Sequence, residues 1–355
     1  MRVRRARALL ITWRGRKLLL TNYQTGVRAT ASAEAFRILN LLRDWTQPKD
    51  LFPALPEYSP KSILSGIREL LKNTFVVRKG TPEANRDSDL AEVWSTWLPD
   101  ASFHFASKDT NYVKPAIAAR MYRRYVAQSP QPPLVKQYRK TQRLQLPKPI
   151  AESEFLRVLM KRRTHREFAA ENLPLDKVSN LLYYTWGVTA KVDAPPFGQL
   201  FLKTSPSGGA RHPGEVYLLA MRVRGLTQGL YHYDGLHHRL ERLASVPALK
   251  KAVEYTADQD FLQDASALFL MTAMFPRTQW KYRFARAYRV VLLETGHLCQ
   301  TFCLVATWLG LAPFCTAALR DTLIEKDLAL DGIRESVLYV AGVGVPVEGR
   351  LRSNL

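Results

Sequence analysis

The chain has 355 residues, enough for two domains at roughly 100–200 residues each. Hydrophobic residues make up 46% and charged residues 23%, which excludes intrinsic disorder or a collagen-like repeat for the whole chain. The formal net charge is +21, and it is uneven. Residues 1–150 carry 27 basic and 11 acidic side chains (+16), whereas residues 151–355 carry 25 and 20 (+5). This asymmetry indicates an anionic partner for the front of the chain, such as an acidic peptide, an anionic surface or nucleic acid.

Three cysteines are too few for a disulfide framework in a chain of this length. Cys299 and Cys303 lie four apart in an apolar run and Cys315 follows alone. We therefore expect buried thiols, no metal site and a cytoplasmic location. No apolar stretch follows the basic start, so we expect no signal peptide. The most apolar segment, 290–313, contains Glu294, which favours a buried core helix over a membrane span.

Residues 1–80 are predicted to form a small α+β domain. Two β-rich runs, 8–13 and 17–22, flank Arg14-Gly15-Arg16, which predicts a hairpin. Ser32 and Ser59 each precede an amphipathic apolar stripe, which predicts two helices with serine N-caps. A strand is expected at 75–77. This order is typical of a winged-helix-like domain.

Residues 81–150 are expected to form a linker followed by a basic wrap. The first part, 81–100, is polar and mixed in composition. Six prolines between Pro115 and Pro149 argue against long regular elements there. We expect this stretch to lie over the surface of the second domain or of a partner subunit.

Residues 151–355 are predicted to form the larger domain. Its expected helices span 155–163, ending in Lys161-Arg162-Arg163, and then 175–186 and 286–309. Its expected strands span 216–223, 229–233, 240–243, 267–274 and 336–345. Helices that alternate with a few strands indicate an α+β sheet sandwiched by helices.

The first motif with a chemical interpretation is the run from Arg162 to Phe168, R-R-T-H-R-E-F. Three arginines and a hydroxyl at a helix end provide donors for an anion, because guanidinium groups bind phosphate in pairs of hydrogen bonds. The alternative is a solvated basic helix end, and for this segment alone the two interpretations are equally good.

The second motif is S-P-S-G-G-A-R-H-P at residues 205–213. Its glycines allow the backbone to approach a ligand, and its serines and arginine supply donors. It lacks the spacing of a P-loop and of a dinucleotide-binding fingerprint. By itself it is also compatible with an ordinary surface loop.

Together the two motifs resemble those of the nitroreductase-like flavoproteins, and among them the SagB-type dehydrogenases that oxidise azoline rings in ribosomally made peptides. The resemblance is clearest from about 153 to 346, and it includes a Lys281-Tyr282 pair and Glu294-x-Gly296-His297. It implies an α+β, nitroreductase-like fold for 151–355, with a central mixed or antiparallel sheet sandwiched by helices. The domain at 1–80 would precede it and bind a peptide.

The same resemblance implies FMN as cofactor and suggests which residues hold it. Arginine would bind the phosphate, Arg166 would lie near the pyrimidine edge, and the serine–glycine loop would pack along the isoalloxazine ring. The implied set is Arg162, Thr164, Arg166, Ser205, Pro206, Ser207, Gly208, Arg211, Thr316, Ala317, Ala318 and Arg350, with Arg352 as an alternative to Arg350.

In azoline oxidases that resemble this chain, the pair that matches Lys281 and Tyr282 supplies acid–base chemistry. Converting an azoline into an azole removes a proton from the ring α-carbon and a hydride from the adjacent carbon. A lysine can take the proton only in its neutral form, which burial or nearby cations favour. The resemblance implies a homodimer and a substrate ring in a peptide or a carrier-bound intermediate, with a cyclodehydratase as a possible biosynthetic partner.

Two alternatives remain open from the sequence. One is a flavoenzyme of the same fold that acts on another small molecule or carrier-bound substrate. The other is a basic, nucleic-acid-binding winged-helix protein, which would explain the charge but leave both flavin-type motifs unexplained. The front domain could equally serve only in dimerisation or folding.

Overall fold

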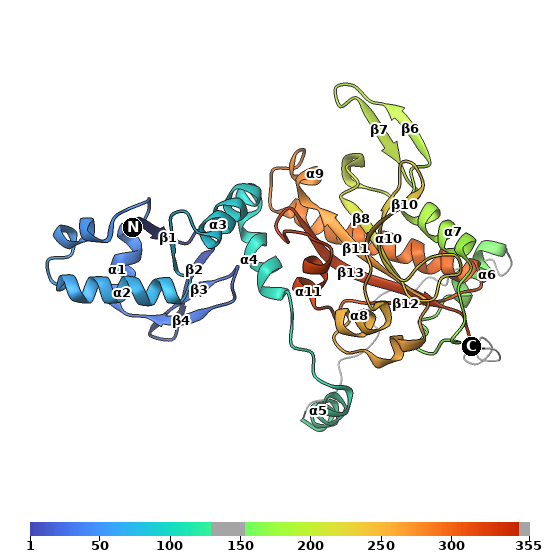
Figure 1. Cartoon of the computed structure of the whole chain (residues 1–355), viewed down its shortest axis with the longest axis horizontal. Coiled ribbons are helices and arrows are strands. Elements are labelled where there is room, and N and C mark those ends of the chain that lie inside the picture. Colours follow the sequence, from blue (N-terminus) through green and yellow to red (C-terminus); the bar gives the residue numbers. More distant parts are fainter. Residues whose placement is uncertain (129–152, 348–355) are drawn as a thin grey trace, which may run out of the picture.

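We analysed a computed structural model that describes residues 1–128 and 153–347. A small front unit, a connecting helical segment and a larger body built on a six-stranded sheet follow one another along the chain (Figure 1).

The front unit contains the predicted hairpin, helices and closing strand. The hairpin is formed by β2 (Leu9–Arg14) and β3 (Lys17–Asn22). Ser32 accepts a hydrogen bond from the amide of Ala35, and Ser59 accepts one from Ser62, so both serine N-caps are confirmed. The remaining elements are β1 (Val3–Arg5), β4 (Arg28–Ala31), α1 (Ala33–Leu41), η1 (Pro48–Ala54), α2 (Pro60–Lys72) and β5 (Val76–Arg78).

These strands form two small antiparallel sheets, β1–β5 and β2–β3–β4. Strand β2 therefore lies at the edge of the three-stranded sheet.

The interpretation of residues 81–100 as a linker is wrong. They form α3 (Pro82–Val93), η2 (Ser95–Trp97) and the start of α4 (Leu98–Ser107). The indole of Trp94 is fully buried and donates a 3.0 Å hydrogen bond to the carbonyl of Ile333, in the larger body. The average composition is polar because α3 is half solvated, but the two tryptophans, Trp94 and Trp97, supply the apolar surface that anchors the segment.

A helix also forms at the start of the Pro115–Pro149 stretch, for which we expected no long regular elements. Helix α5 (Pro115–Gln128) begins at its only proline, which the first turn of a helix tolerates. The other five prolines of this stretch lie outside the described residues. Among the described residues α5 stands apart from both units in Figure 1.

The larger body is built on one antiparallel sheet with strand order β10-β9-β8-β11-β13-β12. The predicted mixed or antiparallel sheet is thus wholly antiparallel in its described pairings. Its strands are β8 (Gly214–Ala220), β9 (Gly229–Asp234), β10 (Arg239–Ala244), β11 (Ala267–Met274), β12 (Ala312–Thr316) and β13 (Glu335–Gly344). Strand β12 was not predicted, because its apolar residues continue the pattern of the preceding helix beyond Gly310.

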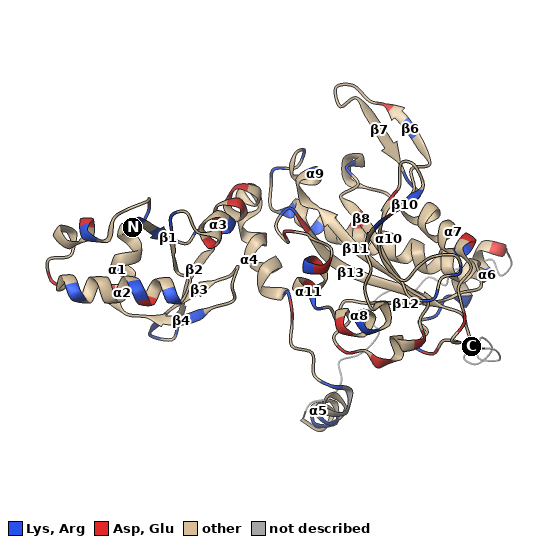
Figure 2. Ribbon diagram, in the orientation of Figure 1, with Lys and Arg blue, Asp and Glu red and all other residues tan. Residues whose placement is uncertain are grey.

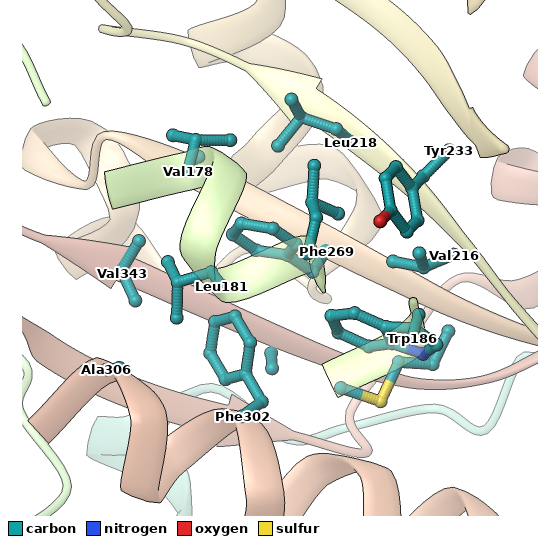
Figure 3. Packing of buried hydrophobic residues seen from close by; sticks show 14 of the residues in the cluster. Val178, Leu181, Trp186, Val216, Leu218, Tyr233, Phe269, Phe302, Ala306 and Val343 are labelled. Atoms are coloured by element: carbon teal, nitrogen blue, oxygen red, sulfur yellow. The ribbon is translucent and has the colours of Figure 1, made fainter. Parts of the chain in front are cut away.

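Helices cover both faces of this sheet, as predicted. One face carries α7 (Leu175–Trp186) and α10 (Arg286–Trp308), and the other carries α8 (Ala248–Tyr255) and α11 (Asp321–Asp327). Figure 3 shows the first interface, where Phe269 of the sheet packs against Trp186 and Phe302, with ring centroids 6.0 and 4.7 Å away.

Among the described helices, α10 alone has the length and apolar composition of a membrane span. Its inner side is packed on the sheet as a core helix.

Three further elements frame the site. Helix α6 (Glu154–Lys161) precedes the first motif, and the short α9 (Phe275–Gln279) precedes Lys281. An unpredicted hairpin, β6 (Ala190–Asp193) with β7 (Gln199–Leu202), projects from the body (Figure 1). Its strands are too short for their alternation to be recognised in the sequence.

Candidate functional site

The serine–glycine motif forms a loop fastened to the core helix α10. The amide of Gly208 donates a 2.6 Å hydrogen bond to the carboxylate of Glu294, which is 6% exposed. The hydroxyls of Ser205 and Thr301 lie 2.7 Å apart, which ties the start of the loop to the same helix. Burial raises the pKa of Glu294, while the Gly208 amide opposes that shift.

Lys281 and Tyr282 lie directly against this loop. Gly209 has a φ of +61°, and a Cβ atom there would meet both the Lys281 Nζ and the Tyr282 hydroxyl at 2.6 Å. Only glycine fits this position, because it offers the left-handed backbone and the space for both polar groups. The structure therefore brings Ser207, Gly208, Lys281 and Tyr282 together.

The ammonium group of Lys281 lies among aromatic rings. Its Nζ is 4.4 Å from the ring centroid of Phe197, at the tip of the β6–β7 hairpin. Arg211 shares this surface, because its guanidinium lies 5.3 Å from the ring of Trp280 and donates to the carbonyl of Gly209 at 3.1 Å. The backbone of Tyr282 is held in place, since its carbonyl accepts a hydrogen bond from the Trp97 indole.

The arginine motif runs as an extended segment from the end of α6. The amide of His165 donates to the carbonyl of Pro313 at 2.9 Å, which holds the segment beside β12. Arg162 is half-buried, and Thr164 and Arg166 are exposed. No described residue forms a hydrogen bond or ion pair with either guanidinium group. These free donors are the chemical set that a phosphate requires.

The segment that follows β12 lies near the arginine motif. Thr316 accepts hydrogen bonds from Gln259 (2.9 Å) and from the amide of Ala318 (3.1 Å). The carbonyl of Ala317 accepts one from Tyr112 (2.9 Å). These bonds fix the backbone that the resemblance places against the flavin ring.

The predicted site thus divides into two groups. One comprises Arg162, Thr164, Arg166 and the 316–318 segment, and the other comprises the 205–211 loop with Lys281 and Tyr282. Within the described part of one chain, no hydrogen bond or ion pair joins the two groups. Arg350 and Arg352 lie outside the described residues.

Sequence reasoning missed several residues that hold the site. The role of Glu294 as anchor of the loop was not predicted, although a carboxylate inside an apolar helix was a signal for it. Phe197 was not singled out, and it lies in the hairpin that the sequence did not reveal.

A second polar cluster lies on β8, β9 and β10. The ring of His232 bridges two carboxylates, with Nε2 at 3.2 Å from Glu215 and Nδ1 at 3.0 Å from Glu241. The hydrogen bond to Glu215, aided by Glu241, raises the pKa of His232 to about 9. Arg277 also forms an ion pair with Glu215, so the charged groups of this cluster are paired with one another.

The three cysteines, which we expected from the sequence only to be buried thiols, lie together in the folded chain. The three sulfur atoms of Cys299, Cys303 and Cys315 all lie within 4.8 Å of one another. The sequence could not show this, because the helix and the strand that carry them meet only in the folded chain.

Residues 159–345 match the family described as "Nitroreductase family". The chain belongs to the nitroreductase family. This membership supports an oxidoreductase activity and agrees with the sheet and the helices described above.

Similar proteins include two that are named for peptide processing. The trifolitoxin-processing protein TfxB of Rhizobium leguminosarum bv. trifolii is 32% identical over 170 residues, which are 47% of this chain and 46% of TfxB. The microcin B17-processing protein McbC of Escherichia coli is 33% identical over 132 residues, 36% of this chain and 48% of McbC. The chain therefore spans about half the length of each.

A nitroreductase of Methanocaldococcus jannaschii is 33% identical over 208 residues, which are 59% of this chain and 98% of that protein. Solved structures also align, among them the E. coli microcin synthetase McbBCD complex with truncated pro-MccB17 bound. That alignment has a TM-score of 0.44 and 22% identity, and it covers 67% of this chain and 96% of that chain.

Proposed function

We propose that this nitroreductase-family protein is an FMN-dependent dehydrogenase that oxidises thiazoline or oxazoline rings of a peptide to thiazoles or oxazoles. The observation that carries the proposal is the convergence of Lys281 Nζ and the Tyr282 hydroxyl on Gly209 of the serine–glycine loop. The names of TfxB and McbC, both peptide-processing proteins, support a peptide substrate.

The donors described above fit FMN. The guanidinium groups of Arg162 and Arg166, which have no hydrogen-bond or ion-pair partner among the described residues, would hold its phosphate and the pyrimidine edge of its ring together with the Thr164 hydroxyl. Ser205, Pro206, Ser207 and Gly208 would line the ring, with Arg211 on the phosphate or ribityl chain and Thr316, Ala317 and Ala318 on the other side. When bound, FMN supplies the hydride acceptor.

In this proposal, Lys281 takes the proton from the ring α-carbon and Tyr282 donates to or orients the heterocycle. The aromatic ring of Phe197 covers one side of the Lys281 amino group, with Nζ 4.4 Å from the ring centroid.

We propose that the active assembly is a homodimer, because no hydrogen bond or ion pair joins the two groups of site residues within residues 1–128 and 153–347 of one chain. A second chain could bring its 205–211 loop to the arginine motif of the first. Gel filtration with light scattering, combined with mixing of Arg166→Ala and Lys281→Met chains, tests this. Partial recovery of activity in the mixture is expected if both chains build one site, and no recovery contradicts shared sites.

The front unit offers a surface for an acidic peptide segment. Two pockets that share Phe36 lie beside strand β2 and helix α1, and we call them together the groove; their apolar lining includes Ile11, Trp13 and Phe36. The same lining carries the basic residues Arg5, Arg7, Arg16, Lys17 and Arg43 and no carboxylate. Lysine and arginine recur across this unit in Figure 2. We propose that an extended acidic segment of the substrate adds to the free edge of β2.

A binding assay with an acidic peptide and its amidated, neutral counterpart tests the groove. Binding of the acidic peptide should weaken with salt and be lost in Arg7→Glu/Arg43→Glu. Lys250→Glu/Arg242→Glu, which reverses the same number of charges at exposed positions of the larger body, should bind like the unchanged protein. Equal binding by both peptides would contradict the proposed surface.

We place the reaction in the cytoplasm, in keeping with three unpaired cysteines.

The test of the function begins with the visible absorbance of the purified protein and the mass of any cofactor that heat releases. About one FMN per chain is expected, and a synthetic azoline peptide should lose two hydrogens on incubation. Lys281→Met should abolish this mass change while FMN content is retained. A colourless protein that cannot be loaded with FMN would exclude the proposed enzyme, and salt-dependent DNA binding would then favour the nucleic-acid alternative.

A further inference from the structure

The cysteine cluster is formed by all three cysteines of the chain. Cys299 and Cys303 lie one turn apart on α10, so their side chains share one face of that helix. Cys315 lies on β12, which packs against α10. The three sulfur atoms lie within 4.8 Å of one another.

The surroundings of the cluster are apolar on one side and polar on the other. Cys299 and Cys303 are 4% and 5% exposed and belong to the core beneath the sheet. Cys315 is half-buried, and its sulfur accepts a 3.2 Å hydrogen bond from the hydroxyl of Tyr339. The guanidinium of Arg162 is close enough to act electrostatically on Cys303 and Cys315.

We propose that Cys299, Cys303 and Cys315 form a binding site for a thiophilic metal ion, with monovalent copper as the best match. Three sulfurs arranged trigonally around one ion at about 2.3 Å each lie about 4.0 Å apart. The sulfurs of the cluster lie within 4.8 Å of one another, so a contraction of at most about 0.8 Å would place all three around one ion.

The ligand type selects the metal. Thiolates are soft donors and prefer copper(I) or zinc(II) to magnesium or calcium. Structural zinc sites have four protein ligands, whereas the described cluster offers three and includes no histidine or carboxylate. Copper(I) is satisfied by three sulfurs. Binding exchanges three thiol protons for one ion, and the positive charge of Arg162 offsets part of the resulting negative charge.

The three thiols lie on the core side of β12 and take no part in the proposed azoline oxidation, and Arg162 is the residue that both proposals use. A bound ion would connect α10 to β12, just before the Thr316 segment. It should therefore raise the thermal stability of the folded chain by mass action.

The test uses the full-length protein, reduced and freed of metal under anaerobic conditions. Copper(I) is titrated in competition with a copper(I) chelator, and zinc(II) is titrated separately against a zinc chelator. We expect one copper(I) per chain, ultraviolet absorption from copper–thiolate charge transfer, and a higher unfolding temperature. Cys315→Ser should weaken copper binding at least about tenfold, because one of three ligands is lost.

Two further variants make the result decisive. Tyr339→Phe keeps all three thiols and should keep the stoichiometry of one. Cys303→Ser tests the helix ligand, and far-UV circular dichroism reports whether each variant is folded. Copper binding that is absent, or unchanged in folded serine variants, overturns the site. One zinc(II) bound in preference to copper, and lost in Cys315→Ser, overturns the assignment to copper.

Discussion

The carboxylate of Glu294 accepts a 2.6 Å hydrogen bond from the amide of Gly208, so the core helix α10 directly holds the loop beneath Lys281 and Tyr282. A buried carboxylate is costly unless it is hydrogen-bonded. Here the hydrogen bond from the Gly208 amide offsets that cost, and the same bond fixes a loop whose backbone must lie close to a ligand. The helix that forms the core of the body therefore also sets the geometry of the candidate site.

Replacing Glu294 with methionine should release the loop. The change leaves the Gly208 amide buried without an acceptor, which costs about 1–3 kcal/mol of folding free energy. Glu294→Gln is the matched control, because its amide oxygen can still accept this bond. Urea unfolding and retained FMN should both report the difference. Equal stability of the two variants would show that the hydrogen bond does not hold the loop.

Gly209→Ala should displace Lys281 and Tyr282 from the loop. Its Cβ would lie 2.6 Å from both polar groups, and these side-chain ends would have to move. Gly15→Ala is the control, because Gly15 has the same φ of +61° with nothing within 4 Å. Both changes should cost about 1 kcal/mol of stability from the left-handed backbone. Only Gly209→Ala should reduce azoline turnover, and an equal loss in both would contradict the role of the contact.

The stability of the larger body should fall in mildly alkaline solution because of His232. Its folded-state pKa is about 9 against an ordinary value of 6.5. This contribution is complete below pH 6.5 and is lost as the pH rises through about 9. The expected loss is on the order of 1–2 kcal/mol, after discounting for partial exposure of the ring.

The measurement is chemical denaturation at pH 6, 7, 8, 9 and 10 for the protein and for His232→Gln. The difference between the two curves isolates the histidine from other titrating groups. It should shrink as the pH rises. A difference that stays constant from pH 6 to 10 would rule out charged His232 as the cause.

Trp94→Ala should destabilise the protein by about 3–5 kcal/mol, the cost of emptying a large buried site. Trp94 is 0% exposed and packs on Phe275 with ring centroids 4.9 Å apart. Trp13→Ala, at a position 73% exposed, should change stability by less than about 0.5 kcal/mol. Denaturant unfolding compares the two. A small effect at Trp94 would restore the interpretation of residues 81–100 as a linker.

The local elements were largely predictable from the sequence. Helix α7 and strand β11 have the predicted ends, because their apolar patterns are long and regular. Serine caps fixed the starts of α1 and α2 through short-range hydrogen bonds. Short elements such as β6, β7 and β12 were missed, since four or five residues carry too little periodicity.

The motifs can be recognised from the sequence alone: the arginine run, the serine–glycine loop, the Lys281-Tyr282 pair and the family they resemble. These are contiguous stretches whose residue types carry their chemistry. Three relationships appear only in the folded chain, namely that Glu294 anchors Gly208, that Trp94 belongs to the larger body and that Cys315 meets Cys299 and Cys303. Each of these contacts joins residues at least 12 positions apart, and packing of helices on the sheet, which no local pattern encodes, brings them together.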